Sequence, residues 1–241
     1  MSSQLSSATN GYPPELAGCR RCVRLTEYRE EVARVKRRAY RNEEYWGAPV
    51  PGFGDLNARL VLVGLAPGAH GSNRTGRMFT GDASGDFLYP ALHRAGLSNK
   101  PTSVDRHDGL ELSGVWITAA ARCVPPGNRP TNAELNECRS WLVHDLDLLP
   151  DLRAVLAIGK VGHDSVIKAW RERGLRTTLA AHQFEHGAVH RLDLLPGAAA
   201  SRALPLIDTY HVSFQNTNTG RLTASMFDEV LALAKEWAGL G

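Results

Sequence analysis

Four short aliphatic runs recur along the chain, and each is followed by a polar or glycine-rich loop. The runs cover residues 59–65, 115–119, 153–158 and 204–210. Because each run is continuously apolar rather than alternating, each is expected to be a strand buried on both faces, as in a parallel sheet. Segments with helical spacing separate the runs. The pattern therefore predicts a single-domain α/β fold, in which a central parallel sheet of four strands lies between two layers of helices.

The expected helices follow the strands. They cover residues 83–97, 131–149, 160–170 and 222–237. The clearest start lies at Thr131 and Glu134, whose spacing fits a capping box that satisfies the first backbone amides of a helix. Pro150 ends that helix, since proline cannot continue it.

Composition excludes several classes of protein. The chain has 241 residues, of which 43% are hydrophobic and 22% charged, unlike a disordered or coiled-coil chain. The uncharged polar start does not resemble a signal peptide, and we expect residues 1–15 to be a disordered leader before a single domain of residues 16–241. No apolar run reaches the roughly 18 residues of a membrane span. We therefore expect a cytoplasmic protein without a membrane partner.

Charge is concentrated near the start of the chain. Residues 20–41 contain nine Arg or Lys and three Glu, so this segment carries +6 and the remainder −3. Such a segment suits phosphate groups of a nucleic acid. The alternative is a solvated basic helix without a partner.

The chain has four cysteines: Cys19, Cys22, Cys123 and Cys138. Without an export signal, disulfides are disfavoured. Four thiolates suit either a tetrahedral zinc ion or an iron–sulfur cluster, and their spacing does not choose between the two. The alternative is two unrelated buried pairs that behave as small hydrophobic residues.

Three loops follow strands at the edge of the sheet where α/β folds bind ligands. The first, residues 64–85, contains six glycines, which permit close approach of the backbone to a ligand. It lacks the motifs of a Walker phosphate loop and of a dinucleotide fold. Asp82 lies near its end, immediately before a helix, where an N-cap is the alternative to a functional role.

The other two loops also carry polar side chains. Asn128 lies between Pro126 and Pro130, and its amide offers a donor and an acceptor that match the edge of a nucleobase. An Asx-turn is the alternative. His211 opens the third loop, which continues in polar residues to Arg221.

Two motifs in these loops resemble those of a known family. They are GLAPGAHGSNRTGRMFTGDASG at residues 64–85 and HVSFQNTNTGRLT at residues 211–223. With the cysteine positions, they make the chain similar to the uracil-DNA glycosylase superfamily, specifically its family 5, or B-type, branch, over nearly all residues after Leu16. Family 4 enzymes carry Glu where this chain has Leu65, so that carboxylate cannot activate water here.

The resemblance implies an enzyme that flips a deaminated base out of DNA and hydrolyses its glycosidic bond. Uracil is the expected base, with hypoxanthine and xanthine as further substrates. Phe79 would stack on the base, Asn128 would read its Watson–Crick edge, and His211 would donate to a carbonyl oxygen of the leaving base. Asp82 would position or deprotonate the attacking water. The backbone amides of two further residues are implied as contacts to the base: Ala69 and His70.

The resemblance also implies a cofactor and a DNA surface. The four cysteines would hold a 4Fe-4S cluster with a structural role. Residues implied to contact DNA are Arg74, Gln215, Asn216 and Arg221, and Gln215, Asn216 or a neighbour would fill the gap left by the flipped base. Double-stranded DNA, and also single-stranded DNA, would be the partner of a monomeric, nucleoid-associated prokaryotic enzyme. The alternatives are a damage-sensing module without turnover and a zinc-stabilised nucleotide hydrolase.

Overall fold

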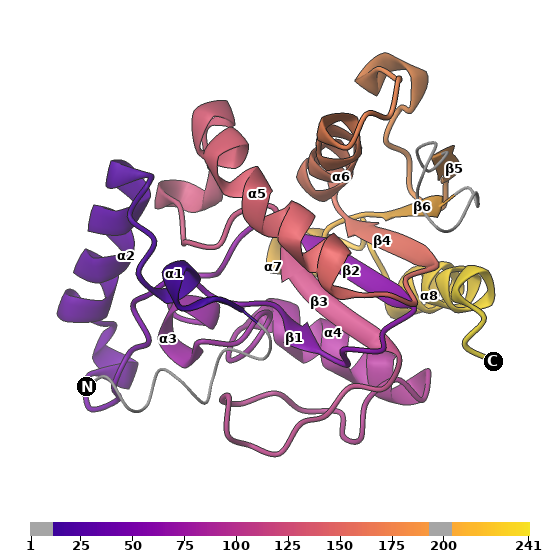
Figure 1. Ribbon diagram of the computed structural model, residues 1–241. Helices are drawn as coiled ribbons and strands as arrows, with labels where there is room; N and C mark the ends of the chain where they lie inside the picture. Colours follow the sequence, from indigo (N-terminus) through magenta and orange to yellow (C-terminus); the bar gives the residue numbers. More distant parts are fainter. Residues whose placement is uncertain (1–11, 193–203) are drawn as a thin grey trace.

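The computed structural model describes residues 12–192 and 204–241 and places a six-stranded sheet at the centre of the chain (Figure 1). The strand order is β1-β3-β2-β4-β6-β5. The four inner strands are parallel, and their bounds lie within one residue of the expected runs: β2 (Leu60–Gly64), β3 (Val115–Ala119), β4 (Ala154–Ile158) and β6 (Leu204–Thr209). The prediction of a central parallel sheet is therefore confirmed.

Two edge strands were not predicted, so the sheet has six strands rather than four. They are β1 (Phe53–Gly54) and β5 (Val189–Leu192). Each pairs antiparallel to its neighbour, β1 with β3 and β5 with β6. Neither contains a continuous aliphatic run, because an edge strand need not be buried on both faces.

Eight α-helices surround the sheet in the described part of the chain: α1 (Pro14–Ala17), α2 (Val23–Val35), α3 (Ser72–Thr75), α4 (Ala83–Arg94), α5 (Asn132–Leu148), α6 (Lys160–Glu172), α7 (Phe214–Asn218) and α8 (Ala224–Ala238). Three short 3-10 helices join them: η1 (Arg38–Tyr40), η2 (Pro126–Asn128) and η3 (Leu179–Ala181). The capping box at the start of α5 is confirmed, with the Thr131 hydroxyl accepting from the Glu134 amide.

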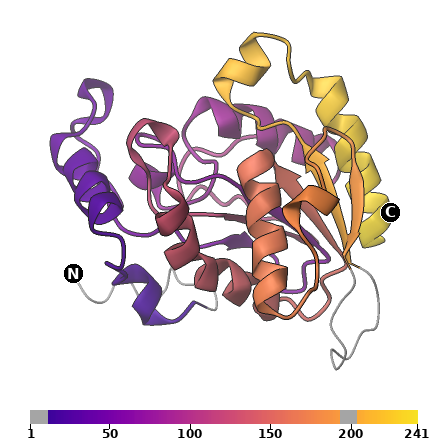
Figure 2. The same ribbon diagram turned by 90° about the horizontal axis from the view of Figure 1, so that it is seen from above.

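Successive side chains along the strands point to opposite faces of the sheet and form two hydrophobic cores. Leu60 and Leu62 pack with α4 and α8, whereas Val61 and Val63 pack with α5 and α6. The two helix layers are seen from the front in Figure 1 and from above in Figure 2. The predicted three-layer architecture is thus present. In the described residues, none of the helices is long and apolar enough to span a membrane.

The described residues include part of the expected leader. Residues 1–11 of the expected leader lie outside the described residues. Tyr12, however, is buried, and its hydroxyl accepts a hydrogen bond of 3.0 Å from the Gly52 amide. Helix α1 then begins at Pro14. The Tyr12 ring, within the segment expected as a leader, therefore packs into the core beside α5.

Candidate active site

A pocket of about 860 Å³ lies where the three expected loops meet, beyond the carboxyl ends of β2, β3 and β6. The residues of these loops that line it include Leu65, Ala69, His70, Phe79, Asp82, Asn128, His211 and Gln215. Arg37 and Tyr40 of the basic segment also line it, which the sequence did not indicate. The prediction that the three loops converge is therefore confirmed.

Asp82 has two differently placed oxygens. Its Oδ1 accepts hydrogen bonds from the amides of Ser84 (3.0 Å) and Gly85 (3.2 Å), so the residue caps α4. Its Oδ2 accepts no hydrogen bond from the described residues and faces Gly68 and Gly71, where a side chain would collide with it. Burial raises the pKa of the carboxyl, and the two amides partly oppose this rise. The cap and a free oxygen in the pocket therefore coexist.

Glycines make space for both the ring and the backbone of Phe79, which lines the pocket. A Cβ on Gly64 would lie 2.6 Å from the ring, and one on Gly85 would collide with the Phe79 carbonyl. The Phe79 backbone has a φ of +51°, an uncommon left-handed value for a bulky residue. Its ring centre lies 6.4 Å from that of His211. The sequence places Phe79 in this loop, but the strain that aims its ring follows only from these contacts.

His211 lies directly after β6 and lines the pocket. Its ring makes no hydrogen bond with the described residues, while its carbonyl accepts from Asn216 Nδ2 at 2.8 Å. Burial lowers the pKa of His211 to about 4, so the imidazole is neutral near pH 7. A neutral ring retains one N–H donor for a ligand.

Asn128 and the preceding glycine-rich loop supply further unpaired polar groups. Asn128 ends η2 with a φ of +57°, a conformation that asparagine tolerates better than most residues. Its carboxamide makes no hydrogen bond with the described residues, which argues against the Asx-turn. The amides of Ala69 and His70 likewise have no acceptor among those residues. His70 is held from behind by the Tyr45 hydroxyl, 3.0 Å from Nδ1.

The expected DNA-contacting residues are placed in different environments. Gln215 and Arg221 are exposed, and Arg221 lies over the Tyr210 ring. Asn216 is half-buried and holds the His211 carbonyl. Arg74 donates to the His70 carbonyl at 2.7 Å and pairs with Glu43, and only 10% of its side chain is exposed. Arg74 therefore holds the glycine-rich loop, which disfavours its expected contact with DNA.

The four cysteines are free thiols, and all of them line one narrow pocket of about 20 Å³ between α2, α5 and the loop after β3. Arg29 Nη1 donates to Cys123 Sγ at 3.0 Å, and the Arg122 amide donates to Cys138 Sγ at 3.2 Å. Burial raises the pKa of Cys138 to about 12. All four cysteines therefore lie around one pocket rather than in two separate places.

Two buried arginines also line the cysteine pocket. The side chains of Arg29 and Arg122 are 3% and 1% exposed. Arg122 pairs with the buried Asp145, and Arg29 Nη2 lies 3.6 Å from Glu30. Arg29 Nε and Arg122 Nε and Nη1 nevertheless have no hydrogen-bond partner among the described residues, and buried guanidinium nitrogens left unpaired are unfavourable. The donor set and its surroundings therefore fit a group whose complex with four thiolates is negatively charged.

Some arginines of the basic segment, residues 20–41, bind other parts of the chain, and others lie at the surface. Arg24 forms two hydrogen bonds of 2.7 Å with Glu134, joining α2 to the start of α5. Arg20 pairs with Glu30 on the surface. Arg37 lies at the pocket of Asp82 and is exposed. The segment is thus neither wholly structural nor wholly free for a partner.

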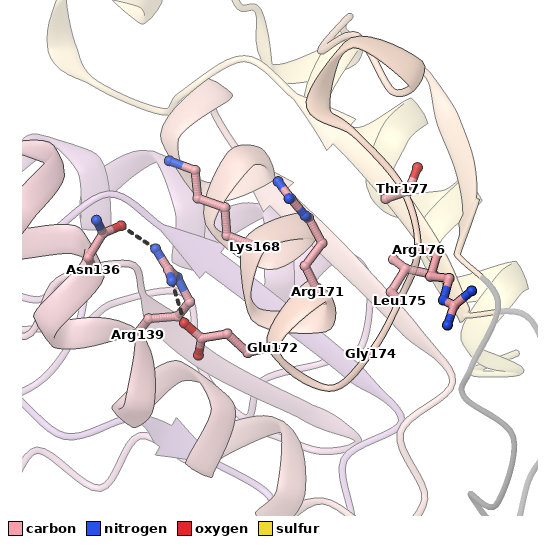
Figure 3. A pocket seen from close by; sticks show the side chains of 9 residues that line it. All are labelled: Asn136, Arg139, Lys168, Arg171, Glu172, Gly174, Leu175, Arg176 and Thr177. Carbon is pink, nitrogen blue, oxygen red and sulfur yellow. Dashed lines mark hydrogen bonds and ion pairs between the residues drawn. The ribbon is translucent and has the colours of Figure 1, made fainter.

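A second open pocket, of about 720 Å³, lies between α5 and α6. Arg139 pairs there with Glu172, and Lys168, Arg171 and Arg176 carry further positive charge. Figure 3 shows that the cationic ends of Lys168, Arg171 and Arg176 do not converge on one point. This surface therefore lacks the geometry of a built anion site.

Comparisons with known proteins agree with the pocket. The model of the uracil DNA glycosylase superfamily matches residues 51–235. A type-5 uracil-DNA glycosylase of Thermus thermophilus is 54% identical over 93% of this chain and 96% of its own. Another, of Pyrobaculum aerophilum, is 49% identical over 93% and 91%.

Type-4 relatives are more distant. The type-4 uracil-DNA glycosylase of Pyrobaculum aerophilum is 33% identical over 52% of this chain and 56% of its own. The chain belongs to the uracil DNA glycosylase superfamily, and its resemblance to the type-5 branch is confirmed.

Proposed function

We propose that this chain is a monofunctional DNA glycosylase that excises uracil, and also hypoxanthine and xanthine, leaving an abasic site. The observation that carries the proposal is the convergence of Asp82 Oδ2, the Asn128 carboxamide and the His211 ring in one pocket, each without a partner among the described residues. Asp82 and His211 are half-buried and Asn128 is exposed, so their free polar atoms are accessible to a ligand in the pocket. Their donors and acceptors match a nucleobase and the water that attacks its sugar.

Binding of the base uses the floor and walls of the pocket. The base is flipped out of the helix and stacks on Phe79. The Asn128 carboxamide pairs with the Watson–Crick edge, and the free amides of Ala69 and His70 donate to a carbonyl oxygen. Tyr45 fixes the His70 ring, so that the loop approaches the base in one arrangement.

Hydrolysis breaks the bond between the sugar C1′ and the base nitrogen. The bonding electron pair leaves with the base, and the neutral His211 N–H stabilises the resulting negative charge on its carbonyl oxygen. Water adds to C1′ and passes a proton to Asp82 Oδ2. The raised pKa of Asp82 favours this proton transfer. Leu65 supplies no carboxylate, so Asp82 is assigned as the acid/base group.

The DNA duplex is placed against α7 and the exposed arginines. Phe214 and Gln215 lie at the pocket rim, and Phe214 is 63% exposed, an unusual position for a phenylalanine. Apolar and polar side chains of this kind fill the gap left by a flipped nucleotide. Arg37 and Arg221 are placed to contact phosphates. We assign both double- and single-stranded DNA as substrates of a monomeric enzyme in the prokaryotic nucleoid.

The four cysteines are assigned as the ligands of a 4Fe-4S cluster. Among the described residues, no three cysteine sulfurs lie within 4.8 Å of one another. The sulfurs are therefore spaced more widely than the ligands of one zinc ion. With four thiolates the oxidised cluster would carry a double negative charge, and the buried Arg29 and Arg122 line the same pocket, where Arg122 also pairs with Asp145. The cluster would cross-link the segment before α2 to α5.

Iron content and visible absorbance test this assignment. Cys123→Ala is expected to lose both, and Arg29→Met to lose iron faster on dilution than wild type. A colourless wild-type protein containing zinc at the cysteines would contradict the assignment.

Catalysis is tested by single-turnover assays on labelled duplexes with U·G, U·A, hypoxanthine·T and T·G pairs and on a uracil-containing single strand. Alkali cleaves the strand at each abasic site. We expect alkali-dependent cleavage of the uracil and hypoxanthine substrates. Binding of these duplexes without any cleavage would instead support the damage-sensing module.

A further inference from the structure

A cluster of three polar side chains lies outside the base pocket, under the first turn of α6 at the edge of the sheet. His163 belongs to α6, His190 to β5 and Asp208 to β6. The side chains of His163 and Asp208 are fully buried, and that of His190 is 12% exposed. None of the three lines the pocket of Asp82. The cluster therefore has a role separate from the proposed hydrolysis.

The ligand atoms of the three residues face one another. His163 Nδ1 lies 2.8 Å from Asp208 Oδ1, and His190 Nε2 lies 3.0 Å from Asp208 Oδ2. All three ligand atoms lie within 4.8 Å of one another. We propose that His163, His190 and Asp208 bind one divalent metal ion of the zinc class.

The second nitrogen of His163 supports a metal at the first. His163 Nε2 lies 2.8 Å from the carbonyl oxygen of His182, so it carries a hydrogen. In a neutral imidazole, Nδ1 then holds a lone pair directed at the Asp208 carboxylate, which is repulsive. Either a second proton or a cation must lie between them. A histidine that binds metal through one nitrogen and donates to a backbone carbonyl through the other is the common arrangement in metal sites.

The second histidine completes a metal-type ligand set. Without a metal, a protonated His163 and an N–H of His190 would each pair with one oxygen of Asp208. Two imidazole nitrogens and one carboxylate oxygen form a zinc-type ligand set, whereas magnesium and calcium prefer oxygen ligands. The fourth position is open to water beside the partly exposed His190.

The metal would add a further link between the sheet and the segment that joins α6 to β5. Residues 173–188 between α6 and β5 contain only the short η3, and β5 is an edge strand. His163, His190 and Asp208 come from the three elements that surround this segment. The ion therefore acts as a structural clamp, which also secures the β6 strand that leads to His211.

Metal analysis tests the site without reference to catalysis. Protein purified without a metal-affinity column and dialysed against a chelator is titrated with zinc in competition with a chromophoric chelator, while iron is measured in parallel. One zinc per chain is expected beyond the iron. His190→Gln and Asp208→Asn should weaken zinc binding by more than about 100-fold without changing the iron content.

His186→Gln is the matched control. His186 lies in the same segment, stacked on Tyr210 with ring centres 4.7 Å apart, and is outside the cluster. This variant should bind zinc as wild type does. Circular dichroism establishes that each variant is folded, and His190→Gln at the sheet edge serves if Asp208→Asn fails to fold.

Two outcomes would overturn the proposal. Wild type that binds no zinc at micromolar free concentration would show that a proton, not a metal, lies between His163 and Asp208. Equal zinc binding by wild type and His190→Gln, in samples with full iron content, would place the ion elsewhere.

Discussion

Two histidines that follow neighbouring strands, one buried and one half-buried, have opposite surroundings. His163 follows β4 in the first turn of α6, and both of its ring nitrogens have partners 2.8 Å away. His211 follows β6, and its ring has no hydrogen-bond partner among the described residues. Gly159, between β4 and α6, packs against His211, where a Cβ would lie 3.1 Å from that of the histidine. The ring nitrogens of one histidine thus both have partners, whereas those of the other have none among the described residues.

The nearby carboxylates repeat this contrast. Both oxygens of Asp208 have histidine partners, whereas Asp82 Oδ2 has none in the described part of the chain. Asp82 and His211 are half-buried and line the pocket, so a ligand can reach their free polar atoms, whereas the side chains of His163 and Asp208 are fully buried and paired. The open groups therefore mark the proposed site of chemistry, and the paired groups mark the scaffold. Replacing an open group should therefore lower the cleavage rate, and replacing a paired group should lower the free energy of unfolding.

Asp82→Asn should show the largest effect, which is a lower rate of base excision. Loss of an acid/base group slows a reaction by about 10²–10⁴-fold. The amide retains an oxygen that can accept from Ser84 and Gly85, so the helix cap and DNA binding should persist. Single-turnover cleavage of a U·G duplex measures the rate, and gel-shift titration measures binding. A wild-type rate in this variant would reduce Asp82 to a helix cap.

His211→Ala should reduce the same rate by about 10²–10³-fold, as loss of one donor to a developing oxyanion does. Because the His211 ring makes no hydrogen bond in the described structure, the thermal unfolding midpoint should change little. The comparison requires both measurements on one sample. An unchanged rate would remove His211 from the mechanism, and His186→Ala is the control for a nearby histidine outside the pocket.

His163→Gln should show the reverse pattern. Removing one partner from a buried charged network lowers the free energy of unfolding by about 3–5 kcal/mol. The cleavage rate per folded molecule should remain that of wild type, since His163 does not line the pocket. Urea unfolding followed by tryptophan fluorescence measures the loss. A loss below about 1 kcal/mol would mean that the cluster is not a stabilising part of the scaffold.

The sequence predicted the elements whose identity is encoded locally. The inner strands are continuous aliphatic runs, and the Thr131 capping box needs residues only three positions apart. Strand β5 was not predicted because His190 and Arg191 interrupt any apolar run. It forms by pairing with β6. Edge pairing depends on distant residues, so no local pattern reports it.

The same limit applies to the sites. Motifs placed Asp82, Asn128 and His211 in converging loops, but they could not show that the two oxygens of Asp82 have separate tasks. The cluster of His163 and Asp208 has no sequence signature, because its members come from three separated elements. Arg74 was expected to contact DNA because the acceptors that hold it are not evident in the sequence.

The smallest expected effect is on the pH dependence of stability. His211 has a folded pKa of about 4, below its ordinary value of 6.5, so the unfolded chain binds a proton first as the pH falls. Folding stability is therefore lost between about pH 6.5 and 4, by about 3 kcal/mol from this group. His211→Ala removes that loss, and its stability should fall less than that of wild type between pH 7 and 4.5.

Asp82 should change the pH dependence of folding stability in the opposite direction. Its folded pKa is raised by burial, so the folded chain binds the proton first, and this group stabilises the fold as the pH falls through the window between its unfolded and folded pKa values. Asp82→Asn should consequently lose more stability on acidification than wild type. Urea unfolding of the three proteins at several pH values measures the differences, in which the shared acid sensitivity of the rest of the chain cancels. Parallel curves would mean that neither open group is buried enough to shift its titration, and the contrast with His163 and Asp208 would then lose its energetic basis.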